Sequence, residues 1–377
     1  MQPLPGHFLL PRALDTAESL TYAAGVKKGG KPPLGGSSAT LNSHVSIKDI
    51  ARAAGVSHST VSRALQGVPV VKPETAARIQ KIALEAGYTA SAVARSLVTR
   101  KTQTIGIVVT KITDPFHHEI ISGVDEVANE RGYSVVLADS RADPEREIRV
   151  VRSFHERRVD GIIVMSSRVG ALYMPMLTEM NVPIVLVNNQ RGAEGDLVHS
   201  VTIDNVQAAR IATRHLIDLG HKHIAYLGNL LGVYSDTERF AGYRQALMDA
   251  RIPFQAQLVA HCANIPEDAA DAMQKLLALR QAPTAVFCYN DLLALGALKA
   301  SGGRARVPHR ISIVGFDDLF FAPFLDPSLT TIRQPMKKMG SLAMDLLFRL
   351  LRGNEVEKTI HVKGELIVRD STAPPPA

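Results

Sequence analysis

The sequence has little of what several common protein classes require. Only 2 of its 377 residues are cysteine, none is tryptophan, and aromatic residues make up 5%. Two thiols cannot form the disulfide framework of a small secreted domain, so we expect a reducing, cytoplasmic environment. No apolar run approaches the roughly 20 residues of a membrane-spanning helix, and the N-terminal segment lacks the basic flank and apolar stretch of a secretory signal.

The positive charge of the chain is concentrated near its N-terminus. Residues 1–100 contain 12 lysines and arginines against 5 acidic residues, a net charge of +7, whereas the remaining 277 residues contain 31 of each sign. A protein needs clustered cations to neutralise the phosphates of DNA. A solvated basic tail would give the same count, so charge leaves that alternative open. The length and the 46% hydrophobic content suit two or three globular domains.

Both ends of the chain have the composition of disordered segments. Residues 1–43 include GVKKGGKPPLGGSSAT, which is too rich in Gly, Pro and Ser to pack. Residues 371–377 read STAPPPA and are expected to form a disordered tail. Either Lys27, Lys28 and Lys31 help to bind phosphate, or translation begins further along the chain, and the sequence is compatible with both.

A compact helical module is predicted for residues 44–90. Ser46 can cap a first helix, with Asp49 reaching back to it as in a capping box. Gly55 is expected to end that helix, and Ser57 to cap the next. A third helix is predicted over ETAARIQKIALEAG. Two short helices joined at a tight glycine turn are typical of a helix-turn-helix.

The segment GVSHSTVSRAL gives the second helix a polar side and an apolar side. Its valines have helical spacing and would pack against the first helix. His58, Ser59 and Thr60 lead the helix, and a core this small offers their polar groups no partners, whereas base edges and phosphates do. The guanidinium of Arg63 could donate two hydrogen bonds to guanine, at O6 and N7. A serine-rich surface helix without a partner is the structural alternative.

From Thr104 onward, short apolar runs such as TIGIVV, GIIVMS and PIVLVNN alternate with helical stretches. Near-continuous apolar runs are typical of strands buried on both faces, which predicts parallel sheets covered by helices. A second series, beginning with HIAYLGN, predicts a second lobe. We therefore expect a two-lobed α/β body over residues 102–370, with a ligand cleft at the carboxyl ends of the strands.

Two segments, IKDIARAAGVSHSTVSRAL and VKPETAARIQKIALEAGYTASAVARSL, are similar to the N-terminal signature of the LacI/GalR family, the lac repressor-type transcription regulators. The resemblance continues to about Val368. It implies an all-α helix-turn-helix DNA-binding domain followed by a two-lobed α/β body of parallel sheets, like that of periplasmic binding proteins. The DNA contacts that it implies are Ser46, Ser57, His58, Ser59, Thr60, Ser62 and Arg63.

The same resemblance assigns residues 91–101 to a hinge helix that orders when two subunits sit on DNA. The segment SAVARSL can form barely two turns, which are marginal in water without a partner. Ser91 would cap this helix, and Ala94 and Leu97 would enter the minor groove, with Leu97 wedged between base steps. An ordinary linker whose leucine packs on the body is the alternative.

In the body, the resemblance implies an effector site built from loop residues at strand ends. Carboxylates, a guanidinium, amides and an aromatic ring suit a polyhydroxylated ligand, because sugars present adjacent donors and acceptors. The body's sequence is similar to that of pentose-type repressors, such as those that respond to ribose, and a purine or a phosphosugar remains open as effector. The implied effector contacts are Asp114, Phe116, Arg239, Asn290, Asp317 and Gln334.

No constellation in the sequence predicts catalysis, a metal site or a cofactor. The pairs His117–His118 and His221–His223 lack a cysteine or carboxylate at ligand spacing, and no GxGxxG, GK[ST] or GxSxG segment is present. Two rival classes of protein would require other sequence features. A sugar-binding transport protein would need a secretory signal and no helix-turn-helix, and an α/β enzyme would need a catalytic set in its cleft.

These observations predict a non-enzymatic, sequence-specific DNA-binding transcription regulator that acts as a repressor. We expect a near-palindromic double-stranded operator, a small sugar-like effector between the lobes, and a homodimer, because the chain ends without the leucine heptads of tetrameric relatives. In some family members the ligand weakens DNA binding and in others it strengthens it, so the sequence leaves open whether the effector releases or recruits DNA.

Overall fold

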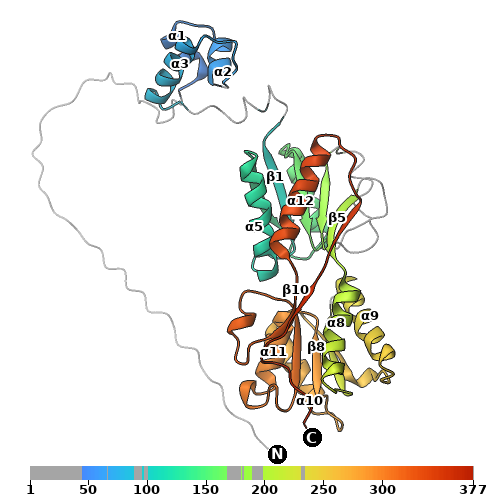
Figure 1. Cartoon of the computed structure of the whole chain (residues 1–377). Coiled ribbons are helices and arrows are strands. Elements are labelled where there is room, and N and C mark those ends of the chain that lie inside the picture. Colours follow the sequence, from blue (N-terminus) through green and yellow to red (C-terminus); the bar gives the residue numbers. More distant parts are fainter. Residues whose placement is uncertain are drawn as a thin grey trace, which may run out of the picture. The chain divides into compact units, whose positions relative to one another are not determined.

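The computed structural model describes residues 45–65, 67–88, 96, 101–167, 180, 182–188, 198–230 and 234–376. The chain divides into two compact units, with the division between Thr89 and Ala90. Each unit has its own hydrophobic core. Figure 1 draws the helices and strands of both units. The predicted extension 1–43 lies outside the described residues, and so does the predicted hinge 91–101 apart from Ser96 and Lys101.

In the described residues of the first unit, three short helices surround a small core. The helices are α1 (Ile47–Ala54), α2 (His58–Leu65) and α3 (Pro73–Glu85). Each contributes apolar residues with helical spacing, and the buried side chains that they share are Ile50, Ala51, Ala54, Val61, Ala64, Ile79 and Ala83. A core this small leaves most polar side chains on the surface, which is where a nucleic-acid contact has to lie.

The predicted start and end of α1 are confirmed. The backbone N–H of Ser46 donates to Asp49 Oδ2 at 3.0 Å, and the Ser46 hydroxyl donates to the same oxygen at 2.6 Å; this hydroxyl lowers the pKa of the exposed Asp49. Gly55 ends the helix in the left-handed region with φ 65°. The Ser57 hydroxyl then accepts from Thr60 N at 3.2 Å, so it caps α2 as predicted.

The second unit contains two six-stranded sheets. The first has the order β11-β5-β4-β3-β1-β2, and all of its pairs are parallel. Its strands are β1 (Thr104–Val109), β2 (Ser134–Asp139), β3 (Gly161–Met165), β4 (Ile184–Val187), β5 (Val198–Ile203) and β11 (Thr359–Val362). The second has the order β12-β10-β9-β8-β6-β7, with only the edge strand β12 antiparallel to its neighbour. Its strands are β6 (Ile224–Asn229), β7 (Val259–Cys262), β8 (Ala285–Cys288), β9 (Ser312–Asp317), β10 (Thr330–Arg333) and β12 (Glu365–Ile367).

Helices cover both sheets, and each sheet with its helices forms one lobe. Lobe 1 is the first sheet with α5 (Pro115–Glu130), α6 (Pro144–Glu156) and α12 (Met336–Leu351). Lobe 2 is the second sheet with α8 (Asn205–Asp218), α9 (Tyr234–Asp249), α10 (Pro266–Leu277) and α11 (Asp291–Ala300). Short 3-10 turns (Ala256–Leu258, Gly303–Ala305 and Ala322–Phe324) complete lobe 2. The predicted two-lobed α/β body of parallel sheets is confirmed.

Strands β1, β3 and β4 of lobe 1 are apolar at successive positions because both of their faces are buried. Ile107 of β1 belongs to the core beneath α5 and α12, whereas its neighbour Val108 belongs to the core beneath α6. Both faces of the strand are therefore buried beneath helices. Figure 1 shows α12 lying beside α5, although more than 200 residues separate them in sequence. The two helices touch backbone to backbone, because Gly340 has no side chain where it meets the carbonyl of Ile120.

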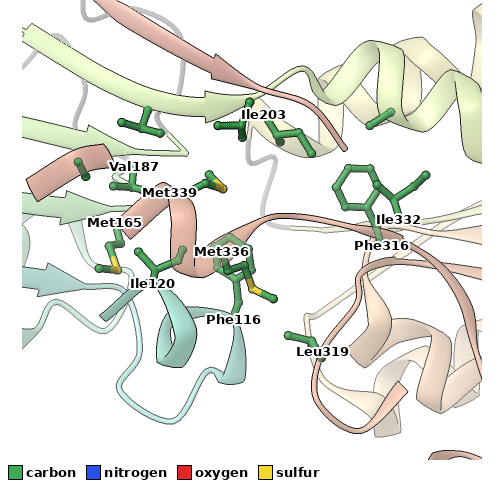
Figure 2. Close-up of a cluster of buried hydrophobic side chains, with 14 of the residues drawn as sticks. Phe116, Ile120, Met165, Val187, Ile203, Phe316, Leu319, Ile332, Met336 and Met339 are labelled. Atoms are coloured by element: carbon green, nitrogen blue, oxygen red, sulfur yellow. The ribbon is translucent and has the colours of Figure 1, made fainter. Parts of the chain in front are cut away.

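The chain passes between the lobes three times, from β5 to α8, from β10 to α12 and from β11 to β12. A continuous apolar cluster lies at this junction. Figure 2 shows Met165 and Met339 of lobe 1 in the same cluster as Phe316 and Leu319 of lobe 2. The two lobes therefore share three chain connections and one apolar junction.

The prediction of a disordered tail at residues 371–377 is wrong for the residues that the structure describes. Ser371 is fully buried, and its hydroxyl donates to Ile313 O at 2.6 Å and accepts from Thr330 N at 2.8 Å. The carbonyl of Ala373 lies 2.9 Å from a ring nitrogen of His221. A Pro-rich composition predicts disorder only when no surface offers such partners, and here the edge of lobe 2 supplies them.

Candidate nucleic-acid interface and ligand cleft

Helix α2 presents the predicted polar residues on the side that faces away from the core. Ser57, His58 and Ser59 are exposed, and so is Arg63, while Thr60 and Ser62 are half-buried. The Ser57 hydroxyl lies 2.8 Å from both the Ser59 and the Thr60 hydroxyl. These short contacts align the first turn without covering it, so the leading side chains can meet base edges and phosphates.

Two groups of predicted DNA contacts have different outcomes. Ser46 is exposed at the start of α1, where its hydroxyl already bonds Asp49. Ser91, Ala94 and Leu97, the predicted hinge contacts, lie outside the described residues.

A cavity of about 750 Å³ opens between the lobes, at the carboxyl ends of both sheets. This is where ligands bind in open parallel sheets. Loops from each lobe supply its walls. Five of the six predicted effector contacts line the cavity: Asp114, Phe116, Arg239, Asn290 and Asp317.

Arg239 holds the centre of the lobe 2 wall and is only 3% exposed. Its Nε donates to Asn205 Oδ1 at 2.9 Å, and its Nη1 donates to the carbonyl of Tyr289 at 2.6 Å. The guanidinium carbon also lies 3.6 Å from the ring centre of Phe316. These contacts fix the guanidinium plane in advance, so a ligand meets an oriented donor at no ordering cost.

Asp317 ends β9 in a left-handed conformation, with φ 115°, and is 3% exposed. Burial raises the pKa of its carboxyl, Arg239 and the hydrogen bond from Gln334 lower it, and the charge of Asp114 across the cavity raises it, so that the pKa is about 7. The carboxyl therefore changes protonation state near neutral pH. A ligand hydroxyl can donate to the ionised form or accept from the neutral one.

Gln334, the sixth predicted contact, does not line the cavity. It lies behind Asp317, where its Nε2 donates to Asp317 Oδ1 at 2.6 Å, and it is 2% exposed. Its Oε1 lies 3.5 Å from Asn188 Nδ2 of lobe 1. Because Gln334 sits in the connection between β10 and α12, the amide holds Asp317 and reaches the other lobe.

Asp114 and Asn290 serve as helix caps, as their positions at helix starts suggest. Asp114 Oδ1 accepts from Phe116 N at 3.0 Å, and Asn290 Oδ1 accepts from Leu293 N at 3.0 Å. Asn290 Nδ2 donates to Asn264 Oδ1 at 2.9 Å. Capping orients both side chains toward the cavity and leaves part of their hydrogen-bonding capacity for a ligand.

Several polar residues of the cavity wall were not predicted from the sequence. Asn188 is the most informative, because its Oδ1 is buried without a hydrogen-bond partner among the described residues and its side chain is 8% exposed. A buried acceptor without a donor is costly, so a ligand hydroxyl would find it unoccupied. The signal that could have found these residues is their place at or just after strand ends. Further examples are Ser166, Asn229, Asn264 and Tyr289, whereas Ser235 lies in α9 and gives no such signal.

The cavity also concentrates unusual backbone conformations. Among the described residues, nine non-glycine residues have positive φ, and five of them line this cavity. Left-handed conformations cost energy in residues with a Cβ and cluster where function demands them. The five residues are Arg141, Ala142, Ser166, Asn188 and Asp317.

Comparisons with known proteins agree with this geometry. Residues 46–91 match the bacterial regulatory proteins of the lacI family, and residues 102–368 match the periplasmic binding proteins and sugar binding domain of the LacI family. The HTH-type transcriptional regulator RegA of Clostridium saccharobutylicum is 37% identical over 332 residues, which are 87% of this chain and 99% of RegA. The chain belongs to the LacI family.

Two solved structures resemble this protein over 87% of its length and 99% of theirs. The transcriptional regulator CelR in complex with cellobiose is 31% identical, with a TM-score of 0.66. The lac repressor dimer bound to operator and the anti-inducer ONPF is 26% identical, with a TM-score of 0.79. This LacI-family protein is therefore a transcription regulator with a DNA-binding helix-turn-helix and a sugar-binding effector body.

Two further features of the described residues bear on other functions. No helix among the described residues is long and apolar enough to cross a membrane. Within the same residues, no three His, Cys, Asp or Glu side chains converge as metal ligands would. His221 instead lies buried among Thr284, Ser312 and the Ala373 carbonyl, and burial lowers its pKa.

Proposed function

We propose that this protein represses transcription by binding a near-palindromic operator, and that a small hydroxylated effector in the cleft controls its affinity for that operator. The single observation that carries the proposal is the two-sided character of α2. Val61 and Ala64 are buried, whereas Ser57, His58 and Ser59 are exposed. A helix fixed by its apolar side, with small polar groups leading, is what reading the major groove requires.

In this proposal, the base contacts come from the first turns of α2, and phosphate contacts come from residues around it. His58 and Ser59 read base edges, and Arg63 offers a bidentate donor to guanine. The remaining contacts position the helix on the backbone. They are Ser46, Ser57, Thr60 and Ser62.

We assign residues 91–101 to a hinge that joins the DNA-binding domain (44–90) to the body (102–370). Ser91 starts a short helix, Ala94 faces the minor groove, and Leu97 wedges between base steps. The unstacking costs a few kcal/mol, and the contacts that a kinked duplex allows offset this cost. Since a helix this short is marginal by itself, its folding can report the state of the body.

The effector contacts in this proposal are the side chains that line the cavity. Arg239 and Asn290 supply fixed polar groups, Asp317 a carboxyl near its titration point, and Phe116 an apolar surface for the C–H face of a sugar. Gln334 acts indirectly, by holding Asp317 in place.

Ligand and DNA are coupled through the junction of the lobes. Effector binding changes how the two lobes close, and closure changes whether paired hinge helices can form. Coupling free energies of this kind are commonly about 1–3 kcal/mol. The solved lac repressor dimer on its operator supports a homodimer here too, because two recognition helices about one helical turn apart match a palindromic site.

We assign no catalytic role to the protein and place it in the cytoplasm, where the DNA that it regulates would be found. The regulators among its relatives support the first assignment, and the DNA-binding domain supports the second.

In vitro selection from a random duplex library tests the proposal with the full-length protein. We expect enrichment of a near-palindromic consensus, bound at least 1,000-fold more tightly than a shuffled duplex of the same composition at physiological salt, as is usual for specific DNA binding. A library that stays random after repeated rounds would refute sequence-specific binding.

A further inference from the structure

The carboxylates and the cations that line the cavity differ in how far other groups of the protein already occupy their hydrogen-bonding atoms. On the lobe 1 wall, the carboxylates are already engaged by backbone donors. Asp139 Oδ1 accepts from Arg141 N at 2.6 Å, and Asp139 Oδ2 accepts from Ile112 N at 3.2 Å. Asp114 accepts from Phe116 N. These carboxylates tie loops and cap a helix, so less of their capacity is left for a ligand.

The cations of the cavity wall, unlike its carboxylates, include two whose hydrogen-bond donors no described residue occupies. Arg239 is committed to Asn205, Tyr289 and the neighbouring Asp317. Lys111 and Arg141 are exposed, and within the described part of the chain their side chains have no hydrogen-bond or ion-pair partner. Lys111 and Arg141 are therefore the cations of the cavity wall whose donors the described residues leave unused.

Lys111 and Arg141 follow adjacent strands of the lobe 1 sheet. Strands β1 and β2 pair in parallel, with Val109 opposite Asp139. Each cation follows the end of its strand by two residues, so both project from adjacent loops at the same edge of lobe 1. Both line the same cavity.

The loop that carries Arg141 is held in an uncommon conformation. Arg141 and Ala142 have φ values of 53° and 55°, which are unfavourable for residues with a Cβ. Asp139 stabilises this loop twice, through its carboxylate on Arg141 N and through its carbonyl, which accepts from Arg146 Nε at 2.8 Å. Strain that is retained at a cavity wall points to a positioning role for this residue.

The rest of the cavity suits an uncharged, hydroxylated part of the same ligand. Within the described residues Asn188 Oδ1 is a buried acceptor without a donor, and Asn264 and Asn290 add amide groups. Phe116 and Leu292 provide apolar surface. One end of the ligand would thus meet two cations, and the other end would meet amides and apolar side chains.

We propose that the effector is an acidic sugar, a sugar phosphate or a sugar acid, whose anionic group is bound by Lys111 and Arg141 at the lobe 1 side of the cleft. The proposal rests on the proposed function, because it names the chemical class of the effector for the same cleft. An anion bridging two adjacent loops of lobe 1 uses the donors that the protein itself leaves unused.

Isothermal titration of the full-length protein tests this with matched pairs of probes. The pairs are ribose with ribose 5-phosphate and glucose with gluconate, so that phosphate and carboxylate are distinguished. At least one anionic member should bind ten or more times as tightly as its neutral partner. In the double variant Lys111→Gln, Arg141→Gln that preference should disappear while the affinity for the neutral sugar changes less than twofold.

The matched control is Arg280→Gln, Lys299→Gln, which removes two exposed cations that do not line the cavity. It should bind all probes as the wild type does. Neutral probes that bind as tightly as anionic ones would overturn the proposal and leave the regulator function intact, and so would an unchanged preference in the double variant. Failure of all four probes to bind also counts against it, while DNA selection reports separately on the proposed function.

Discussion

The guanidinium of Arg239 approaches the carboxyl of Asp317 to 3.7 Å, yet none of its hydrogen bonds goes to that carboxyl. Both side chains are almost completely buried. The positive charge therefore compensates only part of the cost of burying the carboxylate, which is why the pKa of Asp317 is raised to about 7 in spite of the neighbouring cation.

The first prediction concerns the pH dependence that follows from this raised pKa. The folded state binds a proton at Asp317 that the unfolded state has released between about pH 4 and pH 7, so this group's contribution to stability is present at low pH and is lost as the pH rises through 7. Asp317→Asn removes the titration. Its stability relative to the wild type should be higher at pH 8 than at pH 5, by about 2–4 kcal/mol.

Denaturant unfolding of both proteins at pH 5 and pH 8 measures this difference. Asp114→Asn is a useful companion variant. Removing the negative charge of Asp114, which repels the Asp317 carboxylate, should lower the pKa of Asp317 and shift the pH-dependent loss of stability toward lower pH. A stability difference between wild type and Asp317→Asn that is the same at both pH values would contradict the assigned shift.

The second prediction concerns the reading of bases by α2. Exchanging His58 and Ser59 together for alanine should reduce specific operator affinity about 10- to 100-fold, since a good base contact is worth about 1–3 kcal/mol of discrimination. Affinity for random duplex should change little, because phosphate contacts dominate it. Fluorescence anisotropy with both duplexes measures the ratio. Gln80→Ala, an exposed change on α3, is the control, and unchanged operator preference in the double variant would remove the base-reading role.

The third prediction concerns Leu97. Leu97→Ala should cut specific affinity far more than nonspecific affinity, because only the operator complex gains from wedging a side chain between base steps. The same anisotropy assay decides, with Val98→Ala as the neighbouring control. Equal losses on operator and random duplex would count against the wedge.

The fourth prediction concerns the close contact of α5 and α12. A Cβ at Gly340 would lie only 2.0 Å from the carbonyl oxygen of Ile120, and a backbone atom cannot swing aside as a side chain can. Gly340→Ala should therefore destabilise the body by about 1–3 kcal/mol or more, as overpacking of a filled interior does. Thermal unfolding measures this, with the exposed Lys338→Ala on the same helix as control. A melting point equal to that of the control would show that the helices separate easily.

Much of the first unit could be predicted because its determinants are local. Ser46 and Asp49 cap a helix three residues apart, and Gly55 ends it eight residues after it began. The polar start of α2 follows from the same short segment. Hydrogen bonds and apolar spacing within one or two turns are visible in the order of the residues.

The effector site could be predicted in part for a different reason. Parallel strands place all their carboxyl ends at one edge, so residues such as Asp114 and Asn290 can be assigned to a cleft without knowing the packing. Gln334 was misplaced because it follows a strand end like the others, but the chain there turns into the connection between the lobes. The unpartnered oxygen of Asn188 is a property of its surroundings, which no local pattern records.

By itself, the sequence determined the small helical module, the parallel strands and the edge at which polar side chains gather, because hydrogen-bond capping and alternation of apolar runs act over a few residues. Only the tertiary structure decided that α12 returns to pack on α5, that the segment at Ser371 is buried, and that Arg239 leaves Asp317 partly uncompensated. Each of these depends on groups far apart in the chain, and their free energy exists only once the fold has brought them together.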